Sequence, residues 1–229
     1  MNYLDQVLFA VLPYVALFTF FLVTVQRYRM RTFTYSSLSS QFLENRHHFW
    51  GLVPFHYGIL VVLAGHLLAL TLPQELLLWN SVPVRLYALE CTGLAFGFLT
   101  LVGLLASIRR RLTVSKVACV TTKADWILLV LLLLQVITGV AVAIWHPWGS
   151  SWFATSATPY LWSLLRFSPE INYVAAMPWL VKVHMVGAWV LIGYFPFTRL
   201  VHILVAPNPY LWRKPQVVRW YGITHGSTH

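Results

Sequence analysis

The sequence predicts an all-α integral membrane protein with five transmembrane helices, and its composition is the first observation that predicts it. Hydrophobic residues make up 59% of the 229 residues, aromatic residues 16% and charged residues only 10%. A soluble domain carries far more charge and less apolar content. The length suits about five spans of roughly 20 residues with short connections. We therefore treat residues 1–229 as a single membrane domain of a multi-pass protein.

The grouping of the apolar residues is the second observation, because it gives runs that can each cross a hydrocarbon core about 30 Å thick. In chain order the runs cover residues 3–25, 51–72, 86–108, 126–144 and 180–205. The first run has no basic leader and no small-residue cleavage site after it, so we expect a retained span and not a signal peptide. Residues 145–179 are rich in aromatic side chains, which favour the headgroup zone. We expect them to form an interfacial lid with a short helix over residues 160–167.

The positions of lysine and arginine predict the orientation of the spans. Most of the 16 lysine and arginine residues follow the first, third and fifth runs. Only Arg85, Arg166 and Lys182 fall on the other side. The positive-inside rule then places the N-terminus outside and the C-terminal tail, residues 206–229, in the cytoplasm. Topology and anionic lipid headgroups explain the net charge of +10, and we expect a lipid bilayer and no nucleic acid as partner.

Four histidines lie inside these apolar runs, His56 and His66 in the second and His184 and His202 in the fifth. Histidine inside a membrane is costly unless it pairs, lines a cavity or ligates a metal. The two runs are expected to be antiparallel, which pairs His56 with His202 near the cytoplasmic face and His66 with His184 toward the outer face. If residues 180–205 form one continuous helix, the two histidines of the fifth run lie on one face of it, about 27 Å apart. The two histidines of the second run are about 15 Å apart.

Two histidines facing two histidines form the arrangement that holds two haems. His56 and His202 would ligate the iron of an inner haem b, and His66 and His184 that of an outer haem b. The chain lacks a Cys-x-x-Cys-His motif, so covalent c-type attachment is excluded. Interhelical hydrogen bonds or a proton channel would also use buried histidines, although the two runs offer little else that is polar. A haem-free structural anchor would leave the matched histidines unexplained.

Glycines lie beside the histidines, at Gly58, Gly65 and Gly187. They could give backbone room to a flat macrocycle, or they could serve ordinary helix packing in the membrane. The sequence leaves both interpretations open.

Three stretches around the histidines form a specific pattern. They are FHYGIL at 55–60 leading to Gly65-His66, RRL at 110–112 followed by TTKAD at 121–125, and FPFTRLVH at 195–202 with Pro207. A weaker one is Ser39-Ser40-Gln41. In order and spacing over nearly the whole chain, these stretches resemble the gamma subunit of respiratory nitrate reductase.

The resemblance implies a dihaem cytochrome b of the inner (cytoplasmic) membrane that oxidises membrane quinol near the outer face. Electrons would pass from the outer to the inner haem, and then to a cytoplasmic iron-sulfur beta subunit and a molybdenum-containing alpha subunit. Nitrate would be reduced on another chain. The same cytochrome module serving another redox partner is a close alternative. The two cysteines form no cluster for an iron-sulfur centre, so the electron acceptor has to be another chain.

A quinol site near the outer haem needs hydrogen-bonding and proton-accepting groups. The candidates beside Gly65 and His66 are Arg85, Glu90 and Glu75. Arg85 is equally well explained as an anchor at the membrane interface. Haem propionates need cationic partners, and we expect Arg111 and Arg199 to supply them at the inner haem. Topological signalling explains those arginines nearly as well.

Overall fold

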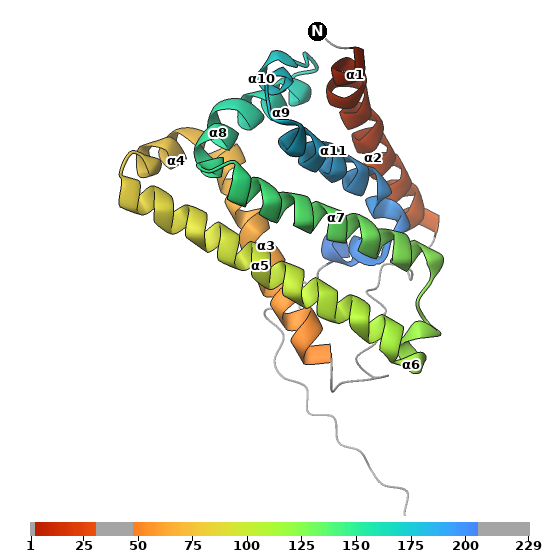
Figure 1. The fold of residues 1–229 in the computed structure, drawn as a ribbon. Helices are drawn as coiled ribbons and strands as arrows, with labels where there is room; N and C mark the ends of the chain where they lie inside the picture. The colour runs from red at the N-terminus through yellow and green to blue at the C-terminus, as the bar shows by residue number, and fades with distance from the viewer. Residues whose placement is uncertain (1–2, 31–47, 206–229) are drawn as a thin grey trace, which may run out of the picture.

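The computed structural model describes residues 3–30 and 48–205, and within those ranges every regular element is a helix (Figure 1). Residues 31–47, which include Ser39-Ser40-Gln41, and the predicted tail at 206–229 lie outside the described residues. Helices labelled α are α-helices, η1 and η3 are π-helices, and η4 and η5 are 3-10 helices. The order is α1 (Tyr3–Gln6), η1 (Val7–Val11), α2 (Leu12–Met30), α3 (His48–Thr71), α4 (Pro73–Asn80), α5 (Pro83–Thr113), α6 (Ser115–Ala118), α7 (Lys123–Trp145), α8 (Gly149–Trp152), η3 (Phe153–Ala157), α9 (Thr158–Leu165), α10 (Asn172–Ala175), α11 (Trp179–Tyr194), η4 (Phe195–Phe197) and η5 (Arg199–Val205).

Five helices in the described ranges are long and apolar enough to cross a membrane, which confirms the predicted number of spans. They are Tyr3–Met30, Gly51–Thr71, Pro83–Thr113, Lys123–Trp145 and Trp179–Phe197. At most 28% of the residues in the apolar window of any span are buried inside the protein. A soluble protein does not leave so much apolar surface in water, so the chain is a multi-pass membrane protein.

Local sequence signals set where the third and fourth spans begin and end. α5 starts with Pro83 in its first turn and stops where Val114 becomes extended, so it is longer than predicted at both ends. α7 begins at a capping box, in which Thr122 Oγ1 accepts the Asp125 N–H at 3.2 Å and Asp125 Oδ2 accepts the Thr122 N–H at 2.9 Å. This reciprocal pair satisfies two N–H groups at the start of the helix.

The spans pack in an order that differs from their order in the chain. α2 packs on α11, α11 on α7, α7 on α5, and α5 most extensively on α3. Figure 1 shows α7 between α5 and α11, with α2 on the far side of α11. The two histidine-bearing spans, α3 and α11, make at most marginal contact with each other. They are therefore supported by α5 and α7 and not by one another.

Glycines bring the backbones of α3 and α5 close together. A Cβ on Gly58 would lie 2.8 Å from the carbonyl oxygen of Phe96 and would overlap the Thr100 hydroxyl. A Cβ on Gly103 would lie 2.8 Å from the carbonyl oxygen of Gly51 and would overlap the backbone nitrogen of Phe55. Gly58 therefore serves helix packing, which is one of the two interpretations that the sequence left open.

The prediction that residues 180–205 form one continuous helix is wrong. α11 ends at Tyr194, because Pro196 has no N–H to donate and its ring disfavours a regular helix. Thr198 is then extended, with φ −112° and ψ 178°, and its Oγ1 accepts the N–H of Leu200 at the start of η5. The expected separation of about 27 Å between His184 and His202 assumed an unbroken helix, so it no longer applies.

Side chains from α1 and α2 hold both ends of the fifth span. At the start of α11, Lys182 Nζ lies 3.0 Å from Asp5 Oδ1. At the break, Arg27 Nη1 donates to the carbonyl oxygens of Pro196 at 2.6 Å and Thr198 at 2.9 Å. Because backbone carbonyls released by a helix break must find donors inside a membrane, Arg27 makes the break tolerable.

The segment between α7 and α11 folds as a cap on one end of the bundle, beside α4 and α1 (Figure 1). α9 confirms the predicted short helix, although it begins earlier. Its Tyr160 is fully buried, donates to the carbonyl oxygen of Phe9 at 2.8 Å, and has a phenol whose pKa is raised by burial. Thr158 Oγ1 donates to Ala69 O at 2.9 Å. The segment is thus packed into the protein as well as lying at the membrane interface.

We expect Gly103→Ala to destabilise the protein by about 1–3 kcal/mol, because the new methyl group would push α3 away from α5. Thermal unfolding of the detergent-solubilised protein measures this loss. Gly93→Ala on the same helix is the control, since a Cβ there meets nothing within 4 Å. It should be neutral or stabilise by up to about 1 kcal/mol. Equal melting temperatures for the two variants would contradict the packing argument.

Candidate functional site

His56 and His66 lie on the unbroken helix α3 and have the same local hydrogen bond. His56 Nδ1 is 2.7 Å from Leu52 O, and His66 Nδ1 is 2.8 Å from Val62 O. A carbonyl oxygen only accepts, so Nδ1 carries the proton in both rings and Nε2 keeps its lone pair. Both side chains are exposed on the protein surface. Each ring is therefore oriented by its own helix and presents Nε2 as a possible metal ligand.

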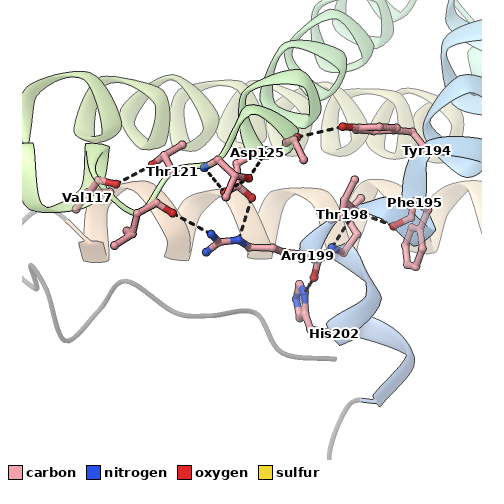
Figure 2. Close-up of polar contacts among 12 residues, drawn as sticks. Val117, Thr121, Asp125, Tyr194, Phe195, Thr198, Arg199 and His202 are labelled. Atoms are coloured by element: carbon pink, nitrogen blue, oxygen red, sulfur yellow. Dashed lines mark hydrogen bonds and ion pairs between the residues drawn. The ribbon is translucent and has the colours of Figure 1, made fainter. Parts of the chain in front are cut away.

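His202 reaches the same state in a different setting. Its Nδ1 donates to the carbonyl oxygen of Arg199 at 2.6 Å within η5 (Figure 2). The ring is half-buried, and again Nε2 remains available as a ligand. Figure 2 shows that His202 lies beyond the turn that follows Phe195, on a segment that runs in a different direction from α11.

His184 is held by side chains from α7 and not by its own helix. Thr138 Oγ1 lies 3.0 Å from His184 Nδ1, and also 2.8 Å from Leu134 O and 3.0 Å from Gln135 O. The Thr138 hydroxyl therefore contacts Nδ1 of this ring, and the amide of Gln135 lies 3.4 Å from its Nε2.

Gln135 completes the contact between α7 and α11. Its Nε2 donates to the carbonyl oxygen of His184 at 3.1 Å and lies 3.2 Å from the Nδ1 of the ring. Two glycines make the space. A Cβ on Gly139 would lie 2.9 Å from His184 Cε1, and one on Gly187 would overlap Gln135 Oε1. Gly187 therefore makes room for a glutamine side chain.

The four imidazoles fit the ligand set of two haems. His56, His66 and His202 have Nδ1 oriented by a carbonyl oxygen, which is the usual state of a metal-bound histidine. The His184 ring is oriented by Thr138 and Gln135 of α7. The His66 ring packs edge-on against Phe153, with ring centroids 5.4 Å apart. A Cβ on Gly65 would meet no atom within 4 Å, so the backbone beside His66 is open to a ligand.

The residues predicted for the quinol site have different partners. Glu90 binds the start of α8, because Oε2 accepts the Gly149 N–H at 3.2 Å and Oε1 accepts the Ser150 N–H at 2.9 Å and its hydroxyl at 2.5 Å. The Arg85 guanidinium lies over the Trp79 ring, 5.1 Å from its centroid. Gly65 is the candidate with open space around it. The structure thus gives Glu90 a structural bond to the cap and Arg85 the interfacial contact that the sequence allowed.

The residues predicted for the propionates lie near the start of α7. Arg199 Nε is 2.9 Å from Asp125 Oδ1, and its Nη2 donates to Val120 O at 3.1 Å (Figure 2). Arg111 Nη1 is 3.4 Å from Ser107 O, and its charge interacts with those of Asp125 and Arg199. Arg199 therefore has a protein partner of its own, whereas the hydrogen bond of Arg111 to Ser107 O, within its own helix, is long.

Sequence reasoning missed three residues that support the histidines. Gln135 and Thr138 are the polar side chains of the apolar run at residues 126–144, and polar groups in a span are a signal for helix contacts. Asp125 was noted in the sequence only as the last residue of the TTKAD stretch at 121–125. Its partner is 74 positions away in the chain, so no local pattern connects the two.

The chain is similar to known proteins over almost all of its length. The nitrate reductase gamma subunit family matches residues 5–221. The nitrate reductase gamma chain of Bacillus subtilis (strain 168) is 28% identical over 217 residues, which are 93% of this chain and 97% of that protein. The respiratory nitrate reductase 2 gamma chain of Escherichia coli (strain K12) is 32% identical over 232 residues, covering 95% of this chain and 98% of that protein.

A longer relative contains a similar region. The nitrate reductase-like protein NarX of Mycobacterium tuberculosis (strain ATCC 25618 / H37Rv) is 29% identical over 221 residues, which are 94% of this chain but 34% of that protein. The matches confirm the resemblance drawn from the histidine-containing stretches. This chain therefore belongs to the nitrate reductase gamma subunit family.

Proposed function

We propose that this protein is the quinol-oxidising cytochrome b subunit of a nitrate reductase in the cell inner membrane. The observation that carries the proposal is the common state of His56, His66 and His202, whose Nδ1–H groups are donated to backbone carbonyl oxygens while their Nε2 atoms are left as ligands. Membership of the gamma subunit family supports it independently.

His66 and His184 would hold an outer haem b, and His56 and His202 an inner haem b. Both haems would supply one-electron redox chemistry, with potentials tuned by ligation and local dielectric. The positive-inside rule favours a cytoplasmic location for the end of the bundle that contains α6, with the N-terminus outside. The cap formed by the segment between α7 and α11 would then lie on the outer side.

Exposed cations at the proposed cytoplasmic end would dock the catalytic partners. Arg109, Lys116 and Lys123 are exposed on and between α5, α6 and α7. Exposed charges of one sign steer a complementary partner and fix its register. We propose that the partners are an iron-sulfur beta subunit and a molybdenum-containing alpha subunit, which carries the nitrate-reducing site.

At the outer end, we propose that quinol binds beside Gly65, where the backbone is open. Glu90 would accept a proton released by the quinol, and Arg85 would lie at the rim of the site. Glu90 is half-buried, and its carboxylate receives three hydrogen bonds from Gly149 and Ser150. Proton transfer to this carboxylate would loosen the cap that covers the site.

His66→Ala and His202→Ala should each remove one of two b haems and retain the other. Each substitution deletes one axial ligand from a different pair. Dithionite-reduced minus oxidised spectra with pyridine haemochrome quantification measure the haem content per chain. His146→Ala is the control, since His146 lies outside the four-histidine set, and it should keep both haems. A folded wild-type protein without haem would contradict the proposed function.

Glu90→Gln should slow quinol oxidation by about a hundredfold, near the lower end of what a general acid–base group contributes. Both haems should remain. Ser150→Ala removes one hydrogen bond to the carboxylate but leaves the carboxylate itself, so it should slow turnover much less. Quinol oxidation by membranes containing each variant separates the two effects. Equal rates for the two variants would show that Glu90 acts only by holding the cap.

A further inference from the structure

His202 lies on a short helix that needs outside support. η5 is a 3-10 helix of seven residues, and runs of that geometry beyond three or four residues are uncommon because their hydrogen bonds are poor. Pro196 and the extended Thr198 separate it from α11. The position of η5 therefore depends on its contacts with other elements.

Arg199, the first residue of η5, makes charge-assisted contacts to the start of α7. Its Nε is 2.9 Å from Asp125 Oδ1, and its Nη2 is 3.1 Å from Val120 O (Figure 2). Asp125 is only 7% exposed, so water and salt screen this pair weakly. The other carboxylate oxygen, Oδ2, accepts both the N–H and the hydroxyl of Thr122 at 2.9 Å. One carboxylate thus ties η5 to the first turn of α7.

The same arginine also orients the histidine ring. The backbone carbonyl of Arg199 accepts His202 Nδ1–H at 2.6 Å, so a displacement of Arg199 would displace the acceptor that sets the ring. His56 and His66 use carbonyl oxygens of the unbroken helix α3 for this purpose. Among the four histidines, His202 is the one whose acceptor belongs to a residue held by an interhelical ion pair.

We propose that the Asp125–Arg199 ion pair is a positioning device for His202, and that Arg199 acts through it and not as a partner of a haem propionate. The inference rests on the proposed function, because it takes His202 as an axial ligand. The carboxylate holds the guanidinium, and the carbonyl of the same arginine fixes the tautomer and plane of the imidazole. Arg111 keeps its expected role near the inner haem.

Asp125→Asn and Arg199→Gln in the full-length protein within its membrane complex test this inference. The midpoint potential from redox titration and the ferric low-spin EPR signal should change for the haem that His202→Ala removes. Both should stay unchanged for the haem that His66→Ala removes. The double variant should show no larger change than Arg199→Gln alone, since Arg199→Gln already removes the ion pair that Asp125→Asn breaks. Arg199→Lys should change the potential and EPR signal of the inner haem less than Arg199→Gln does. The ammonium group of lysine reaches the carboxylate but lacks the planar fork that also reaches Val120 O.

Hydrogen exchange gives a readout that does not require haem. Amides of residues 199–205 should exchange faster in Asp125→Asn than in the wild type. Asp5→Asn is the matched control, since it breaks the Lys182–Asp5 pair at the other end of the fifth span, whose side chains are 22% and 17% exposed, against 25% and 9% for Arg199 and Asp125. It should leave both the inner haem and the exchange of residues 199–205 unchanged.

The possible results separate the alternatives. A changed inner haem in Arg199→Gln but not in Asp125→Asn would mean that the arginine acts directly on the haem, which overturns the inference. No change in either variant, with two haems in the wild type, would overturn the inference and leave the proposed function intact. A wild-type protein without haem would overturn both. If Asp125→Asn fails to fold, as judged by loss of the outer haem, Arg199→Gln decides because it leaves the α7 capping box intact.

Discussion

The need to satisfy each histidine N–H inside an apolar layer is the constraint on which this structure depends. A polar group without a partner costs several kcal/mol where water cannot reach it. His56, His66 and His202 meet the need by donating Nδ1–H to a backbone carbonyl oxygen, and the His184 ring meets it through Thr138 and Gln135. The same bond fixes the tautomer and the ring plane. The requirement that makes a histidine tolerable in the membrane is thus the requirement that prepares it as a ligand.

The two histidine-bearing spans meet this constraint in different ways. On α3 the acceptors are carbonyl oxygens one turn earlier, so helix geometry alone orients His56 and His66. The fifth span is interrupted at Pro196, and its carbonyls at the break are held by Arg27. Its two histidines consequently depend on residues that are distant in the chain. Sequence periodicity describes the first case well and the second poorly.

The same distinction explains what the sequence could predict. Hydropathy predicts the five spans because the cost of placing charge in a bilayer is large and local. Local sequence patterns likewise indicate the four histidines and the resemblance of the stretches around them to a known family. The break in the fifth span was missed, because a proline can also be tolerated within a membrane helix. That the helix ends near Pro196 is evident only in the structure, where Thr198 is extended and Arg27 binds the carbonyl oxygen of Thr198. The Glu90 and Arg199 contacts were also missed, since their partners lie at the starts of α8 and α7, which are distant in the chain and are brought near by packing.

α7 contains none of the four histidines, yet it supports both of those on the fifth span. Near its middle, Thr138 Oγ1 contacts His184 Nδ1, and Gln135 donates to the backbone carbonyl of the same residue. At its start, Asp125 holds Arg199, whose carbonyl accepts from His202. A displacement of α7 along its axis would therefore disturb a ligand in each proposed pair, whereas the ligands on α3 would keep their own acceptors. The start of α7 follows α6 at the end of the bundle where the exposed lysines lie, so a partner that binds there would contact the helix that orients both rings of the fifth span.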